Sequence, residues 1–211
     1  MKDEKTVLKE RCKYIGGIFL FFSWMLAAFI ALEIAAGLWL GYQPESDFAL
    51  TLSDTPSGLF GVAEFKGMTP EIFEVIKPYR FEFDPGTLNE TASQMPKYVY
   101  MAKHFTAAVG VMGGLALVFW FMGRVFGNIM RYETPFIKEN SRSIAGLGIA
   151  ISASIIIGRN MFSFLLFIKG IIVEKFEWIE FLWVMPLILF FCLSAVFDYG
   201  RVLQQESDET L

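Results

Sequence analysis

The chain has 211 residues, of which 55% are hydrophobic and 17% aromatic, and its mean hydropathy is positive. This composition exceeds the apolar share that is usual in soluble domains, and it argues against a soluble enzyme. The formal net charge of −4 says less than the positions of the charged residues, because those positions indicate the orientation of a membrane protein.

Four stretches carry no charged residue, namely residues 15–32, 105–123, 143–158 and 181–197. A helix that crosses a bilayer core needs about 20 mostly apolar residues, and each stretch reaches that length with its flanks. The third does so if it includes Arg159 and continues to residue 168. The sequence therefore predicts an all-α membrane protein, a four-helix transmembrane bundle that forms one membrane domain over residues 1–211. The predicted spans are about residues 15–41, 104–130, 143–168 and 180–200.

The first apolar stretch also has features of a secretory signal peptide. Its uncharged core is longer than the roughly 7–15 residues of a signal-peptide core, and no clear small-residue cleavage site follows it. An uncleaved first span is therefore favoured over a signal peptide.

Basic residues cluster beside the predicted spans at two places, and such clusters are typical of the cytoplasmic side. Lys2, Lys5, Lys9, Arg11 and Lys13 precede the first span, and Arg124, Arg131, Lys138 and Arg142 lie between the second and the third. We therefore expect both termini in the cytoplasm, with a cytoplasmic loop at residues 131–142 and a cytoplasmic tail at residues 201–211. The remaining segment, residues 42–103, is predicted to be an extracytoplasmic loop of about 60 residues.

Six of the eight prolines lie in this outer loop, which is too long for a plain connector and should fold onto the helix ends. Residues 69–71, Thr-Pro-Glu, have the pattern of a helix start, and Pro78 would end that short helix. Residues 79–83 then alternate between aromatic and charged side chains, which predicts a strand with one apolar face.

Two opposite charges lie at similar depth within predicted spans, Glu33 in the first and Arg159 in the third. Because a charge within the membrane is costly, their matched depth predicts an internal ion pair. The pair would either fix helix packing or take part in ligand or proton binding, and separate snorkelling of the two side chains to the outer interface is the alternative. Ser152, Asn160 and Ser163 add a polar face to the third span.

No catalytic or metal-binding arrangement can be assembled from the sequence. His104 is the single histidine, and Cys12 and Cys192 are far apart in the chain. Neither a metal site nor a disulfide framework is therefore indicated. We expect a non-enzymatic protein without a cofactor. At the cytoplasmic end, Asp198 has two alternative partners, Arg124 and the nearby Arg201.

Small residues recur at four-residue spacing in the second span, at Gly110 and Gly114 and again at Gly123 and Gly127. This spacing lets helix backbones approach closely in lipid. Packing within the chain is favoured over a dimer motif, and a homo-oligomer stays the alternative.

The segment at residues 133–140, Glu-Thr-Pro-Phe-Ile-Lys-Glu-Asn, and the C-terminal segment at residues 197–211 resemble a bacterial membrane family, the uncharacterised domain of unknown function 2975. The positions that match are Pro135, Phe136, Asn140, Gly200, Leu203, Gln204, Glu206 and Asp208. The outer loop is longer here than is usual in that family. Family genes commonly stand beside one for a small helix-turn-helix regulator, so the resemblance implies a membrane partner of a transcription factor, in the bacterial cytoplasmic membrane.

The sequence leaves two main hypotheses about function. A third hypothesis, a membrane enzyme, has the least support. The first is a sensor or regulatory partner that contacts a helix-turn-helix regulator through the matching residues and Arg142, without direct contact to nucleic acid. The second is a small-molecule or ion transport or toxin-immunity protein that uses Glu33 and Arg159. The basic N-terminal run is explained by topology, with contact to anionic lipid of the bilayer as a further role.

The regulatory reading requires an ordered surface on the cytoplasmic side. We expect Phe136, a large apolar residue in a charged loop, to pack against the cytoplasmic ends of the second and fourth spans. Asn140 is predicted to cap the third helix. The alternative is a tight connector beside a solvated tail.

Overall fold

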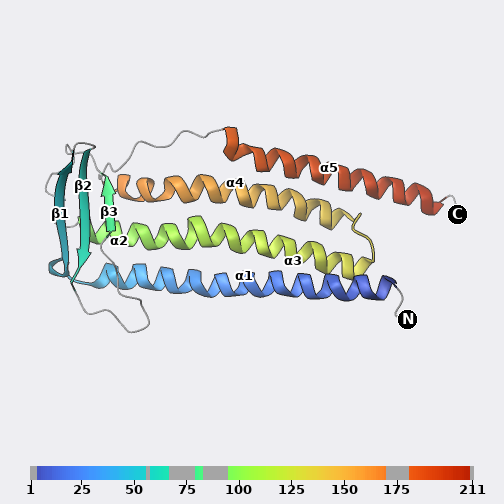
Figure 1. Ribbon diagram of the computed structural model, residues 1–211, viewed down its shortest axis with the longest axis horizontal. Helices are drawn as coiled ribbons and strands as arrows, with labels where there is room; N and C mark the ends of the chain where they lie inside the picture. Colours follow the sequence, from blue (N-terminus) through green and yellow to red (C-terminus); the bar gives the residue numbers. More distant parts are fainter. Residues whose placement is uncertain (1–3, 56–57, 67–78, 83–94, 170–180, 210–211) are drawn as a thin grey trace. The chain divides into compact units, whose positions relative to one another are not determined.

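The computed structural model describes residues 4–55, 58–66, 79–82, 95–169 and 181–209 (Figure 1). The helices are α1 (Glu4–Tyr42), a 3-10 turn (Glu45–Asp47), α2 (Met95–Phe105), a π-helix (Thr106–Gly113), α3 (Gly114–Tyr132), α4 (Lys138–Phe167) and α5 (Phe181–Glu209). The strands are β1 (Phe48–Thr55), β2 (Gly58–Phe65) and β3 (Tyr79–Glu82).

Four helices in the described part of the chain are long and apolar enough to cross a membrane: Thr6–Tyr42, Met95–Tyr132, Lys138–Phe167 and Leu182–Glu209. The second of these joins α2, the π-helix and α3 into one run. A helical bundle with four candidate membrane-spanning helices, which the sequence predicts, is therefore confirmed.

The helices extend beyond the predicted spans at several ends. The second run begins at Met95, not near residue 104, and Pro96 fits in its first turn because no intrahelical partner is needed for a backbone N–H there. The segment between the first two helices is correspondingly shorter than residues 42–103. The connection between α3 and α4 shortens to residues 133–137, and α5 continues to Glu209 through most of the predicted tail.

The chain divides into two compact units, which are described separately. Unit 1 comprises Met1–Phe29, Val111–Ile156 and Ile179–Leu211, and unit 2 comprises Ile30–Gly110 and Ile157–Trp178.

Unit 2 contains an antiparallel sheet in the order β1-β2-β3 (Figure 1). The predicted strand at residues 79–83 is confirmed at Tyr79–Glu82, whereas the hairpin of β1 and β2 was not predicted. The short helix predicted after residue 69 lies outside the described residues. The sheet contributes Phe48 and Ala63 to a buried core, and the helices complete it with Leu40, Met95, Val99, Tyr100, Ala102 and Leu166. The Tyr100 hydroxyl donates a hydrogen bond to the Ala63 carbonyl at 2.9 Å, which fixes α2 to β2.

Three of the four glycines spaced at four residues in the second helical run lie at helix contacts, whereas a Cβ on Gly127 would meet nothing within 4 Å. Within unit 1, a Cβ on Gly114 would collide with the Ser154 side chain, and a Cβ on Gly123 would lie 2.7 Å from Leu20 Cγ. Within unit 2, a Cβ on Gly110 would lie 2.8 Å from the Gly158 Cα. These three glycines therefore serve packing within the chain.

The turn between α3 and α4 begins at Glu133, which adopts a left-handed conformation with φ of 58°. Its N–H donates to the Ile129 carbonyl at 2.9 Å and closes the end of α3. Pro135 follows two residues later, where it opposes continuation of the helix. Glycine usually occupies such a position because a side chain there costs energy. Here the Glu133 carboxylate accepts a hydrogen bond from Lys9 Nζ at 2.8 Å, between two exposed side chains.

Replacing Glu133 by glycine and by alanine separates the backbone strain from the ion pair. Both variants remove the exposed salt bridge to Lys9, which is worth about 1 kcal/mol or less. Only glycine adopts the left-handed conformation without strain. The free energy of unfolding of Glu133→Gly should therefore be about 1 kcal/mol higher than that of Glu133→Ala. Denaturant unfolding in micelles measures the difference, and equal stabilities of the two variants would contradict this role of the turn.

Candidate functional site

The connection at residues 133–137 is held against α5 within unit 1. Thr134 Oγ1 donates a hydrogen bond to Gln204 Oε1 at 2.8 Å and accepts one from the Phe136 N–H at 3.2 Å. The Phe136 ring packs on the Phe197 ring, with centroids 5.5 Å apart. A Cβ on Gly200 would lie 2.5 Å from Phe136 Cδ1, so only glycine fits beneath the ring. We name Thr134, Phe136, Phe197, Gly200 and Gln204 the loop-end surface.

The predicted contact of Phe136 with the fourth span is thereby confirmed, and its contact with the second stays a prediction. Phe136 keeps 36% of its surface exposed, so it is anchored and still accessible. The connection is therefore not a free loop.

Asn140 belongs to the same end of unit 1, but it is not a helix cap as predicted. Helix α4 begins earlier, at Lys138, and places Asn140 inside its first turn. The side chain is fully buried: its Nδ2 donates to the Pro135 carbonyl at 3.0 Å, and its Oδ1 accepts from Asn128 Nδ2 at 3.0 Å. Asn140, on α4, therefore binds the connection through the Pro135 carbonyl and α3 through Asn128.

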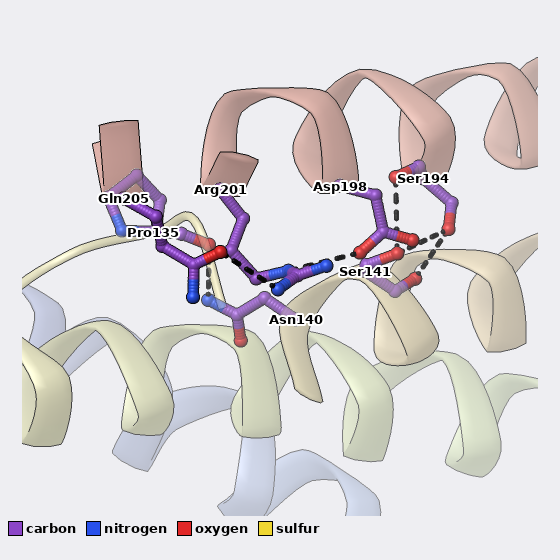
Figure 2. A network of polar contacts seen from close by, with 7 residues as sticks. All are labelled: Pro135, Asn140, Ser141, Ser194, Asp198, Arg201 and Gln205. Carbon is purple, nitrogen blue, oxygen red and sulfur yellow. Dashed lines mark hydrogen bonds and ion pairs between the residues drawn. The ribbon is translucent and has the colours of Figure 1, made fainter. Parts of the chain in front are cut away.

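A pair of buried serines joins α4 to α5 next to this connection (Figure 2). The hydroxyl oxygens of Ser141 and Ser194 lie 2.8 Å apart, and each also lies within hydrogen-bond distance of the other residue's carbonyl, at 3.1 and 2.9 Å, so the two hydroxyl protons are shared among these three contacts. Neither residue is among the candidates that the sequence predicts. Their signal is weak, because serines are common at helix contacts in membranes.

The charged groups of α5 interact along their own helix. Arg201 Nε lies 3.7 Å from Asp198 Oδ1, and Arg201 Nη1 lies 3.5 Å from Gln205 Oε1 (Figure 2). Of the two predicted partners of Asp198, the structure therefore has Arg201. The guanidinium of Arg124 lies over the Trp120 ring instead, 4.8 Å from its centroid.

The other predicted interaction residues divide by exposure. Gln204 is half-buried in its contact with Thr134, whereas Leu203, Glu206 and Asp208 are exposed on the helical extension of α5. Arg142 is exposed on α4. The predicted solvated tail is thus helical as far as Glu209.

In unit 2, Glu33 pairs with His104 and not with Arg159. The Glu33 Oε2 atom lies 2.6 Å from His104 Nδ1, and no bridge joins the two described residues Glu33 and Arg159. His104 lies in the last turn of α2, and Glu33 lies on α1. Arg159 is exposed on α4 and has an interaction of its own.

The polar face predicted on α4 serves mainly as a buried surface. Ser152 in unit 1 and Ser163 in unit 2 are buried, and Asn160 in unit 2 is half-buried. Nothing in the described part of the chain assembles these three side chains into one site. Among the described residues there is also no group of three or more His, Cys, Asp or Glu side chains that could hold a metal ion.

Comparisons with protein-family models, with curated proteins and with solved structures find no match to this chain. The resemblance to the bacterial membrane family therefore depends on the short segments at residues 133–140 and 197–211.

Replacement of Asn140 tests whether its buried contacts order the connection. Asn140→Ala leaves the Pro135 carbonyl and the Asn128 amide without this partner, so it should destabilise the protein by about 1–3 kcal/mol. Ser143→Ala is the matched control, because the Ser143 hydroxyl bonds only within its own helix, to the Glu139 carbonyl at 2.8 Å. Unfolding in micelles would contradict this role if both variants lost the same small amount of stability.

Proposed function

We propose that this chain is a non-enzymatic protein of the bacterial cytoplasmic membrane that acts as a sensor or regulatory partner of a small cytoplasmic helix-turn-helix transcription factor. The observation that carries the proposal is the ordered loop-end surface, in which Thr134 bonds to Gln204 and Phe136 packs over Gly200. Three residues of this surface, Phe136, Gly200 and Gln204, are among the eight positions on which the family resemblance depends.

An ordered surface suits a binding partner for a physical reason. Association loses less free energy to ordering when the contacting groups are already held in one arrangement. Phe136 meets this condition, because it is fixed on α5 yet about one third exposed. Aromatic residues of this kind commonly contribute most of the binding free energy of an interface.

Exposed charged side chains of unit 1 supply polar groups for the rim of such an interface. Arg142 on α4 and Glu206 and Asp208 on α5 are all exposed. Rim charges mainly raise association rates and specificity, and the aromatic centre provides the affinity. The regulator would in this way be retained at the membrane without any contact of this chain with nucleic acid.

The proposal requires the loop-end surface to be cytoplasmic. In a variant that lacks Cys12 and Cys192, a cysteine introduced by Ser46→Cys should react with a membrane-impermeant maleimide in intact cells. The matched Ser207→Cys variant should react only after lysis, because the basic clusters predict that this end is cytoplasmic. The reverse labelling pattern would remove the loop-end surface from the cytoplasm.

Co-purification with the proposed helix-turn-helix regulator tests the partnership. Phe136→Ala removes the aromatic anchor, and Gly200→Val displaces the ring, so each should lower recovery of the regulator about tenfold or more. A truncation after Val202 should act likewise, because it removes Gln204. Tyr199→Ala is the control, an exposed aromatic residue of α5 that neighbours Gly200.

Recovery that is unchanged in Phe136→Ala, in Gly200→Val and in the truncation would contradict the proposal, provided that all variants reach the membrane. Equal loss in Tyr199→Ala would indicate a general effect on α5 and would contradict the specific role of Phe136.

A transport or toxin-immunity function is the second candidate, and the Glu33–His104 pair favours it. Ionisable groups within membrane helices are frequent parts of ion pathways and proton relays. Under this function, Glu33→Gln should abolish flux or protection in a cell-based assay, whereas Phe136→Ala should leave it intact. The opposite result, loss in Phe136→Ala alone, would argue for the regulatory partnership.

A further inference from the structure

The pair of Glu33 and His104 has the geometry of a site that binds protons. Their atoms Oε2 and Nδ1 are 2.6 Å apart, which is short for a contact between nitrogen and oxygen and requires a proton between the two atoms. The side chains are largely buried, with 28% of Glu33 and 15% of His104 exposed. Each residue is distinctive in the sequence: Glu33 is the sole charged residue between Lys13 and Tyr42, and His104 is the single histidine.

The other nitrogen of His104 is buried as well. Nε2 has no hydrogen-bond partner among the described residues. When the imidazole is neutral and its proton is on Nδ1, Nε2 carries only a lone pair, so the burial of a bare acceptor is its sole penalty. When the imidazole is charged, Nε2 carries a buried N–H without an acceptor, which is a larger penalty.

Neighbouring charged groups act in opposite directions on the imidazole. Glu33 on α1 is negative and stabilises the imidazolium. Lys103 on α2 is electrostatically coupled to Glu33 and competes with the imidazolium for that carboxylate. On β2, Glu64 is coupled to Tyr100 on α2, and on α4 Arg159 is exposed.

The local packing permits this close approach. Gly37 lies one turn after Glu33, and a Cβ there would meet the His104 Cβ at 3.4 Å and the Phe105 ring at 3.5 Å. The π-helix begins immediately afterwards, at Thr106, and π-helices are frequent at functional sites.

We propose that His104 and Glu33 form a proton-binding site in unit 2, in which Nδ1–H donates to the Glu33 carboxylate and an incoming proton binds at Nε2. The step is a simple protonation: the Nε2 lone pair forms an N–H bond to a proton from water, and Glu33 balances the charge of the resulting imidazolium. The new N–H then needs an acceptor, so proton uptake favours a rearrangement around His104 that brings one to it. This site is independent of the loop-end surface and of the regulator.

Nuclear magnetic resonance of the imidazole nitrogens tests the proposal directly, because a protein labelled with ¹⁵N-histidine carries a single such ring. The protein is purified in nanodiscs through a tag without histidines and titrated from about pH 4 to pH 9, which covers the ordinary range of imidazole titration. In the wild type, the neutral ring should carry its proton on Nδ1, and a neutral ring protonated on Nε2 would overturn the proposal.

Two variants and a control test the direction in which each neighbouring charge shifts the pH at which the imidazole loses its charge. Glu33→Gln should lower the pH at which the ring loses its charge by about one unit or more, because the opposite charge is gone. Lys103→Gln should move that pH upward, and the exposed control Glu45→Gln should leave it unchanged. Identical titrations in the wild type, Glu33→Gln and Lys103→Gln would overturn the proposal. If Glu33→Gln does not fold, the wild-type proton position and the Lys103→Gln shift still decide it.

Discussion

In a bilayer, apolar side chains gain little by leaving lipid for one another, so helices associate where small residues let backbones approach and where buried polar groups meet. The described helices follow this constraint within each unit. In unit 1, the missing side chain of Gly148 leaves room for Phe190 of α5. The hydroxyls of Ser141 and Ser194 form a hydrogen bond nearby. In unit 2, the missing side chain of Gly110 lets the backbone of Gly158 approach closely. The loop-end surface depends on the contacts within unit 1, because they hold α5, which carries Gly200, against α4.

The sequence predicts elements well where one physical signal dominates. Length and hydropathy identify the four helices, and strict alternation identifies the strand at Tyr79–Glu82. The hairpin of β1 and β2 gives a weaker signal, because Gly61 and Glu64 interrupt the alternation of β2 and Asp54 ends that of β1. The start of α2 is also hidden: Met95–Phe105 is too polar for a span, and it is helical because its apolar side packs on the core of unit 2.

Depth alone does not determine the partner of a charge within a membrane helix. Glu33 and Arg159 lie at comparable depth by residue counting, but a partner must also face the carboxylate around the axis of its own helix. His104 meets both conditions, and Arg159 is exposed on α4. That rotation depends on where the helical run begins and on the π-helix after Phe105, neither of which the sequence reveals.

Phe136 could be placed from sequence because a large apolar side chain among charged neighbours needs a surface to cover it. Asn140 could not, because a buried asparagine and a capping asparagine look alike in sequence. The structure distinguishes the two: α3 continues to Tyr132 and ends at the left-handed Glu133, and α4 begins at Lys138. The connection is therefore short, and Asn140 lies within α4 and donates to the Pro135 carbonyl. The strained backbone of Glu133 and the buried amide of Asn140 therefore act together. A longer, relaxed connection would leave Asn140 free to cap and would lose the arrangement that holds Phe136 against Gly200.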